Sequence, residues 1–403
     1  MLYAGSRRPS HGCTLSYGRD YSPVTGVVLG FEMNRLETLI SLLVIYGGRM
    51  LRREINTAIE HSCVRLDKIA APPVKYWLQV YVQGMDVEDA RVQRTLDEAK
   101  SFPPRVKLLR ALREDGTWPI SKHRQTAEDS GPGPPFGWTS ITMVRNLYLL
   151  HDYCVLSDEG YVNNALDMIL SWQNDEGYIA GPSTDMIPTP FYNGVALSIF
   201  MKFGVSRNDQ RVAKLIDWLM RMQRHDGGWN VPYVQDVKYL PQHKHLKMDE
   251  FIGLVKRGDI PYDPRAFRDI PSCYWSTVGA LTGLAWISND PTDPRLKDIV
   301  RGGDFVLDGF FKKNNHSSFF RSEKHWTTLK YPTYFGSGYW ALHSLVNLGF
   351  GPEDSRTETP VRWLLQARAK DGFWYHKERP HKLQDQWLTV SILMILRRYL
   401  NLF

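Results

Sequence analysis

The sequence has few cysteines and no long run of apolar residues. Its 403 residues include four cysteines, Cys13, Cys63, Cys154 and Cys273, which form neither a C-x-x-C pair nor a compact disulfide framework. This excludes a disulfide-stapled scaffold and predicts reduced thiols in a cytoplasmic protein. The best apolar run, residues 39–46, is too short to cross a bilayer. We therefore expect a cytoplasmic protein and keep peripheral membrane contact as an alternative.

Long basic runs and the common nucleotide-binding motifs are also missing. The formal net charge is +7, but the Lys and Arg residues are scattered along the chain. This pattern predicts a solvated basic surface and no nucleic-acid partner. The sequence has no Gly-rich phosphate loop, nucleophile elbow or dinucleotide fingerprint. We expect no cofactor.

Apolar residues are plentiful and support a large core. They make up 43% of the chain, and aromatic residues make up 12%. A length of 403 residues would ordinarily suggest two or three domains, but a repeat architecture escapes this limit because each repeat packs on its neighbours. Residues 1–33 show no sustained periodicity, and we expect a poorly ordered leader there. We expect one domain over residues 34–403.

A repeated phrase runs through that domain: a helix that ends in Asp-Gly-x-Trp, then a loop, then a more apolar helix. A degenerate copy fits at residues 313–320. The other copies centre on Gly116, Gly177, Gly227 and Gly372. Self-similarity at such a period is typical of a helical array or ring.

The physical role of the phrase can be read around Gly227. Apolar residues recur at helical spacing over residues 211–224 and form one stripe. Gly227 supplies the left-handed turn that ends the helix. We predict that Trp229 folds back on this helix and that Gln223 bonds the backbone of the turn.

The helices that come after the turns are apolar on several faces, whereas the preceding helices carry charge on one side. The apolar set is expected at residues 73–82, 138–154, 191–203, 274–287, 334–348 and 384–400. This difference predicts two concentric layers, with apolar helices inside. We predict an all-α fold, an (α/α)6 toroid of helix–turn–helix repeats, with an insertion at about residues 230–271.

The turn sequence carries a family resemblance. Trp218–Trp229 reads W-L-x-x-x-Q-x-x-x-G-x-W, which resembles the Gln-Trp motif of squalene–hopene and oxidosqualene cyclases, and Trp363–Trp374 is a variant. The layout over residues 60–403 also resembles the β-subunits of protein prenyltransferases. The resemblance implies a central cavity that holds an isoprenoid or similar lipid. It also implies acid-initiated carbocation chemistry that would cyclise or isomerise this ligand.

The acid for such chemistry is not obvious in this chain. The cyclase family carries an Asp-x-Asp-Asp motif at the start of an inner helix, and this sequence has none. The remaining candidates for catalysis are Asp185, Asp269, Glu128 and Asp129. Asp185 comes just before an inner helix, where burial would raise the pKa of its carboxyl towards that of a general acid. A turn or cap role is the alternative.

Aromatic residues cluster where the inner helices begin, and these ends should converge on one mouth of the ring. Their faces would hold an apolar chain or stabilise a carbocation by about 2 kcal/mol through cation–π attraction. Ordinary core packing is the alternative for each of them. The candidates for substrate binding are Trp138, Phe191, Tyr192, Tyr274, Trp275, Trp326, Tyr331, Tyr334 and Trp387.

Other classes of site and function are weaker. The segment from Asp269 to Cys273 is similar to the zinc-binding segment of protein prenyltransferases, but its spacing departs from theirs and the next inner helix starts without His. We expect no metal. A non-catalytic lipid-binding or interaction scaffold remains open. So does a carbohydrate-active enzyme, which would need paired carboxylates from Glu128, Asp129 and Asp185.

Overall fold

The computed structural model describes residues 26–120, 138–180, 187–314, 320, 322–332, 336–376 and 382–403. The chain divides into two compact units, residues 1–51 and residues 52–403, and each is described by itself. Helix α1 (Gly26–Ile69) runs through both units, and the predicted boundary at residue 33 falls inside this helix. The helical repeats and the pocket between them lie in the second unit, residues 52–403.

Every regular element in the described part of the chain is helical, apart from one isolated bridge between Gln173 and Ile179. The elements after α1 are α2 (Pro72–Trp77), η1 (Leu78–Val82), α3 (Ala90–Lys100), α4 (Pro103–Ala111), α5 (Trp138–Asp152), η4 (Ser157–Glu159), α6 (Asn163–Ser171), α7 (Pro190–Lys202), α8 (Gln210–Arg221), η5 (Asp236–Tyr239), α9 (Met248–Lys256), η6 (Pro264–Phe267), α10 (Tyr274–Leu284), η7 (Ala285–Asn289), α11 (Leu296–Asp308), α12 (Glu323–Trp326), α13 (Gly338–Asn347), η8 (Ser355–Thr357), α14 (Glu358–Gln366) and α15 (Lys382–Leu400). The prediction of an all-α fold is confirmed. Among the described helices, none is long and apolar enough to cross a membrane.

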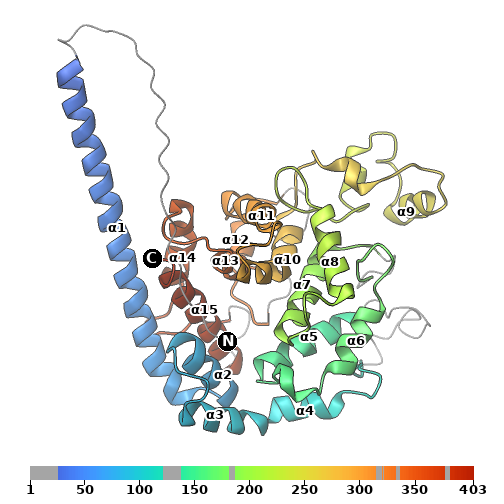
Figure 1. Cartoon of the computed structure of the whole chain (residues 1–403), viewed down its shortest axis with the longest axis horizontal. Helices are drawn as coiled ribbons and strands as arrows, with labels where there is room; N and C mark the ends of the chain where they lie inside the picture. Colours follow the sequence, from blue (N-terminus) through green and yellow to red (C-terminus); the bar gives the residue numbers. More distant parts are fainter. Residues whose placement is uncertain are drawn as a thin grey trace. The chain divides into compact units, whose positions relative to one another are not determined.

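The inner layer consists of α2, α5, α7, α10, α13 and α15. Helices α7 and α10 lie side by side (Figure 1) and are buried over most of their length because both are apolar on all faces. Glycines permit the close approach: a Cβ on Gly194 would come within 2.1 Å of the carbonyl oxygen of Gly279. The outer helices α8 and α11 bury one stripe only, as amphipathic surface helices do.

The first and last inner helices are joined, so the inner layer closes into a ring. In α15, the Gln386 side chain accepts a hydrogen bond from the backbone N–H of Ala71 at 2.8 Å and donates to the carbonyl of Ile69 at 3.1 Å. Arg397 Nε donates to the carbonyl of Val82 at 2.8 Å. These contacts confirm the predicted toroid.

The turns between the layers are built as the sequence predicted. Trp229 is fully buried, and its Nε1–H donates to the carbonyl of Leu219 in α8 at 2.7 Å. Gln223 Nε2 donates to the carbonyl of Gly227 at 2.8 Å and to that of Asp298 in α11 at 2.7 Å. The turn is therefore closed on its own helix and tied to the next repeat.

Adjacent outer helices are also tied together by an Asp-x-Arg phrase that was not recognised in the sequence. In each case the Asp accepts a hydrogen bond from the backbone N–H of the Arg two residues later, and that Arg reaches an Asp of the preceding outer helix. Arg211 reaches Asp167 at 3.2 Å, and Arg295 reaches Asp217 at 3.3 Å.

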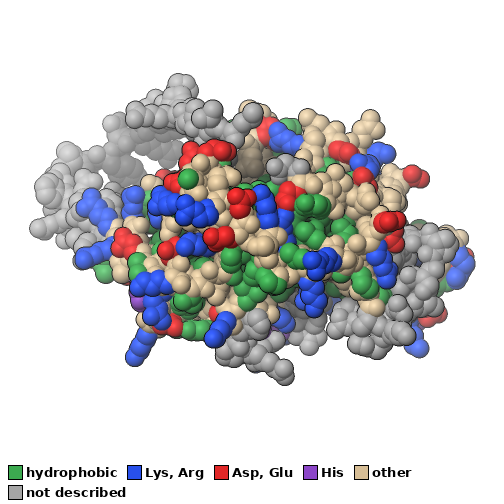
Figure 2. Space-filling model, turned by 90° about the horizontal axis from the view of Figure 1, so that it is seen from below, with side chains coloured by type: hydrophobic (Ala, Val, Ile, Leu, Met, Phe, Trp, Pro, Cys, Tyr) green, Lys and Arg blue, Asp and Glu red, His purple; other side chains and the backbone are tan. Residues whose placement is uncertain are grey.

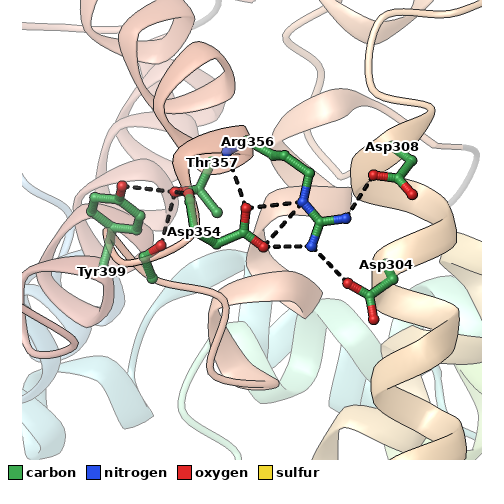
Figure 3. A network of polar contacts seen from close by, with 7 residues as sticks. Asp304, Asp308, Asp354, Arg356, Thr357 and Tyr399 are labelled. Atoms are coloured by element: carbon green, nitrogen blue, oxygen red, sulfur yellow. Dashed lines mark hydrogen bonds and ion pairs between the residues drawn. The ribbon is translucent and has the colours of Figure 1, made fainter. Parts of the chain in front are cut away.

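Figure 3 shows the most connected copy of this phrase. Arg356 pairs with Asp354 beside it and with Asp308 and Asp304 of α11, at 2.6 and 2.7 Å. The neighbouring Thr357 hydroxyl lies 2.8 Å from the Tyr399 hydroxyl of α15. The same few residues therefore connect α11, the start of α14 and α15.

The segment predicted as an insertion, residues 230–271, holds η5, α9 and η6. It is anchored by a buried ion pair in which Arg224 contacts both carboxylate oxygens of Asp236, at 3.0 and 2.9 Å. The Tyr262 hydroxyl donates to the same carboxylate at 2.6 Å. In α9, Phe251 and Ile252 are buried. The apolar face of α9 thus packs within the protein.

Figure 2 shows a face on which Lys, Arg, Asp and Glu side chains are interspersed, with hydrophobic side chains between them. This distribution agrees with the scattered positive charge read from the sequence.

Candidate ligand pocket

A pocket opens at the centre of the ring, and all six inner helices contribute to its wall. It encloses about 880 Å³ of space, its open mouth included. The enclosed cavity itself measures about 110 Å³. The described residues that line it are Trp77, Tyr148, His151, Asp152, Ser198, Lys202, Thr282, Trp286, Tyr331, Pro332, Tyr339, Trp340, His343, Trp387, Val390, Ser391, Met394 and Ile395.

Aromatic rings supply much of the wall, and several are held against one another. Tyr331 and Trp387 are stacked, with ring centroids 5.5 Å apart and planes 9° apart. Tyr148 and Trp340 lie 5.8 Å apart. The indole N–H of Trp340 donates to the Thr282 hydroxyl at 2.8 Å, whereas the buried N–H of Trp387 donates to no described residue. The pocket thus presents fixed aromatic faces and few free polar groups.

A small polar group lies where α5 and α7 end. Asp152 Oδ2 accepts a hydrogen bond from the Tyr331 hydroxyl at 2.5 Å. The backbone carbonyl of Asp152 accepts the indole N–H of Trp77 at 2.7 Å. His151 Nδ1 lies between two charged groups, 3.9 Å from Asp152 Oδ1 and 3.4 Å from Lys202 Nζ.

Enclosure by the inner helices changes the titration of these groups. Burial, together with the nearby Lys202 ammonium, lowers the pKa of His151 to about 4 despite the opposing effect of Asp152. Burial is also the main cause that lowers the pKa of His343 to about 4, and the charges of Lys202 and Arg398 lower it further. The His343 ring nonetheless lines the pocket. Both imidazoles are therefore neutral at pH 7. Burial also lowers the pKa of Lys202 and raises that of Tyr148.

Two of the predicted ligand-binding aromatics, Tyr331 and Trp387, line this pocket. Phe191 and Trp275 lie elsewhere, stacked on each other with centroids 4.3 Å apart. Trp275 also packs against the hydrophobic cluster formed by Ile187, Val231 and Ile252. The insertion therefore covers this pair of rings.

Three other predicted aromatics lie between helices. The Tyr192 hydroxyl is 2.5 Å from that of Ser140. Tyr274 packs on Phe305 of α11 and on Trp326. Trp326 is fully buried, and its Nε1 donates to the carbonyl of Lys312 at 2.8 Å, much as Trp229 bonds to α8. Trp326 thus closes the turn of its own repeat.

The remaining predicted site residues are exposed or lie outside the described part. Asp269 is 91% exposed and contacts His225 Nδ1 at 2.7 Å. Trp138 begins α5, but its side chain is not described. Glu128, Asp129, Asp185 and Tyr334 fall outside the described residues. Their roles stay predictions.

Cys273, the thiol of the zinc-like segment, is fully buried, and its Sγ accepts a hydrogen bond from Asn314 Nδ2 at 3.3 Å. Burial raises the pKa of this thiol, which disfavours the thiolate that binds metals. Within the described residues, no group of three His, Cys, Asp or Glu side chains is placed to hold a metal ion.

The polar part of the pocket, His151, Asp152, Lys202 and His343, was not predicted from the sequence. A signal was available, because these are polar residues in helices that are otherwise apolar on all faces. Three of them lie at the C-terminal ends of α5 and α7, whereas the aromatic pattern pointed only to the starts of the inner helices. Lys202 there also interacts favourably with the helix dipole.

No protein-family model matches the chain, and no curated protein matches it. Solved structures align over most of its length at low identity. A protein from Actinoplanes is 12% identical, with a TM-score of 0.44, over 86% of this chain and 99% of that chain. A variant of the type II terpene cyclase MstE from Scytonema, bound to its product merosterolic acid A, is 13% identical, with a TM-score of 0.47, over 88% and 99%. A second variant of MstE, bound to its substrate geranylgeranyl dihydroxybenzoate, is 12% identical, with a TM-score of 0.46, over 88% and 100%.

Proposed function

We propose that this protein binds an isoprenoid or a comparable long apolar molecule in the central pocket. The observation that carries the proposal is the pocket wall, to which all six inner helices contribute and in which aromatic faces and aliphatic side chains predominate. Each methylene that a ligand buries there contributes about 0.8 kcal/mol. A chain of many carbons gains most from such a site.

The pocket's polar groups do not favour a sugar. Glycan-processing sites present two facing carboxylates. Among the described lining residues, Asp152 is the only carboxylic acid, and Tyr331 already donates to it. An oligosaccharide would also need many hydrogen-bond partners, whereas Thr282 and Ser198 are already bonded within the wall.

We further propose that the protein cyclises or isomerises the bound isoprenoid by acid-initiated chemistry. Asp152 accepts a hydrogen bond from Tyr331, and this arrangement suits a carboxylate better than a proton donor. Asp185 remains our candidate acid on sequence grounds alone. Non-catalytic lipid binding is the second candidate function, and it is favoured by this use of Asp152 as an acceptor.

Calorimetric titration of the full chain with farnesol and with maltohexaose tests the binding proposal. We expect saturable farnesol binding and none of the sugar. Trp340→Ala, which removes part of the wall, should weaken farnesol binding at least tenfold. Tyr161→Ala is the matched control because Tyr161 is 57% exposed and does not line the pocket. Sugar binding without isoprenoid binding would refute the proposal.

Turnover is tested separately. Extracts of the protein incubated with geranylgeraniol or squalene should contain a cyclised or isomerised product by mass spectrometry. Asp185→Asn should abolish this product and leave binding nearly intact, because an amide has the shape of the acid but cannot protonate an alkene. Binding without any product in the wild-type protein would favour the non-catalytic alternative.

A further inference from the structure

Lys202 is a cation at the pocket wall that makes no direct ion pair with a described carboxylate. It ends α7, and no carboxylate of the described residues lies within 4 Å of its Nζ. Its contacts are His151 Nδ1, at 3.4 Å, and the face of the Tyr148 ring, whose centroid is 5.6 Å away. By contrast, Lys100 at the surface pairs with Asp97 at 2.8 Å.

The groups that face Lys202 leave its charge largely uncompensated. His151 and His343 are neutral at pH 7 because the pKa of each is about 4. Asp152 approaches the same His151 nitrogen as Lys202, at 3.9 Å, and its charge favours the ammonium, but its carboxylate accepts the Tyr331 hydroxyl. Arg398, which acts on His343, adds positive charge. One carboxylate therefore faces two cations, and it is not in contact with Lys202.

An ammonium in such a place is costly unless it finds an anion. It carries three N–H donors, and one long contact to an imidazole satisfies at most one of them. Transfer of a charged group out of water is unfavourable unless the group is paired and hydrogen-bonded. A ligand that brings its own anionic group would supply that pairing.

We propose that Lys202 binds an anionic head group, a carboxylate or a phosphate, of the apolar ligand whose chain lies against the aromatic wall. The inference rests on the proposed function, since the chain must enter the pocket for its head to reach Nζ. Lys202 then determines specificity: it selects an acid over the corresponding ester or alcohol. His151 is a positioning residue that holds Nζ where α5 and α7 end.

The experiment compares ligands with one chain and different heads. Farnesoic acid, methyl farnesoate, farnesyl monophosphate and farnesol are titrated into the full chain at pH 7 by calorimetry. We expect at least one anionic ligand to bind ten or more times tighter than both the ester and the alcohol. The tighter of the two anions identifies the head group. Equal affinity for all four ligands would overturn the inference and leave the proposed function standing. Binding of none would overturn both.

Variants assign the preference to this lysine. Lys202→Met should reduce the preference for the anion to less than twofold and keep binding of methyl farnesoate, which also reports an intact pocket. Lys297→Met is the matched control, an exposed lysine of α11, and should keep the full preference. A preference that survives Lys202→Met would overturn the inference.

A measurement on the wild-type protein covers the case in which Lys202→Met fails to fold. The preference for farnesoic acid over its methyl ester should fall as pH rises from 7 to 10.5, because Lys202 loses its proton and the ligand remains charged. The pKa values of His151 and His343 lie well below that range, and burial raises the pKa of Tyr148, whose ring faces Lys202. A preference that is unchanged up to pH 10.5 would overturn the inference.

Discussion

Tryptophans occupy two regions of this molecule, the turns between the layers and the central pocket, and they behave differently in each. In the turns, Trp118, Trp229 and Trp374 each donate Nε1–H to a carbonyl of the preceding outer helix, at 2.9, 2.7 and 2.7 Å. In the pocket, two of the four tryptophans, Trp77 and Trp340, also donate, to groups of the pocket wall. The other two do not anchor the wall in this way: Trp387 donates to no described residue, and Trp286 is 37% exposed. The first group fixes the repeats, and the second leaves an apolar surface for a ligand.

The largest expected effect is in the turns. Trp229→Ala should lower the free energy of unfolding by about 4 kcal/mol, because a fully buried indole is lost and its space cannot refill completely. Denaturant unfolding measures the change. Trp286→Ala in the pocket is the control and should cost under about 1 kcal/mol. Equal losses in the two variants would mean that the turn and pocket tryptophans do not differ in structural role.

The turn glycine should rank next. Gly227 has φ of +92°, and a Cβ there would come within 2.5 Å of the carbonyl oxygen of Arg301. Gly227→Ala should destabilise the protein by about 3 kcal/mol, through backbone strain and the clash with α11 together.

Gly349 separates these two causes. Its φ is +93°, and no atom lies within 4 Å of the added Cβ. Gly349→Ala should therefore cost only the backbone strain, about 1 kcal/mol. If both variants lose the same stability, the contact with the next repeat contributes nothing.

The turns could be predicted from the sequence, and the pocket could not, for a physical reason. A turn uses a fixed local phrase, so Gln223, Gly227 and Trp229 reveal their contacts by spacing. An inner helix such as α7 is apolar on every face, so its periodicity does not say which face or which end meets the cavity.

Two further features were hidden for related reasons. Trp326 lies 14 residues after its acceptor Lys312, whereas Trp229 lies ten residues after Leu219, so Trp326 does not fit the spacing of the other copies. In the sequence, the Asp-x-Arg phrase, as in Asp354 and Arg356, cannot be told from ordinary surface charge. Its role becomes visible only when the position of the neighbouring outer helix is known. Contacts within a repeat can be predicted from residue spacing along the chain, whereas contacts between repeats can be recognised only when the arrangement of the repeats in the ring is known.

Acid should destabilise the pocket region rather than the turns. The pKa of His151 is about 4 in the folded protein and 6.5 in the unfolded chain, so the unfolded state binds more protons between these values. Stability present above pH 6.5 is therefore lost as pH falls towards 4, by about 2 kcal/mol after allowance for solvent screening. Lys202 strengthens the shift and Asp152 opposes it.

Denaturant unfolding at pH 7, 5.5 and 4.5 measures this loss. His151→Gln should reduce the dependence of stability on pH, and a variant that also carries His343→Gln should reduce it further, because the pKa of His343 is likewise about 4. His225→Gln, at an imidazole that is 61% exposed, should leave it unchanged. If the double variant retains the full slope, the acid sensitivity arises outside these two imidazoles.

The smallest expected effect comes from the same substitution, Trp to Phe, made once in a turn and once in the pocket, and it compares the two tryptophan groups most directly. Trp374→Phe removes an indole N–H that is bonded to the carbonyl of Leu364, and the carbonyl left behind is buried. The loss of that bond should cost about 1 kcal/mol beyond the change in ring size. Trp387→Phe removes a donor that is bonded to no described residue and keeps an aromatic ring against Tyr331. Its change in unfolding free energy should therefore be smaller by about 1 kcal/mol. Paired denaturant melts measure the difference. An equal loss at both sites would mean that Trp387 has a bonding partner in solution, such as a water molecule held in the pocket, and the pocket would then be wetter than a site for an apolar chain should be.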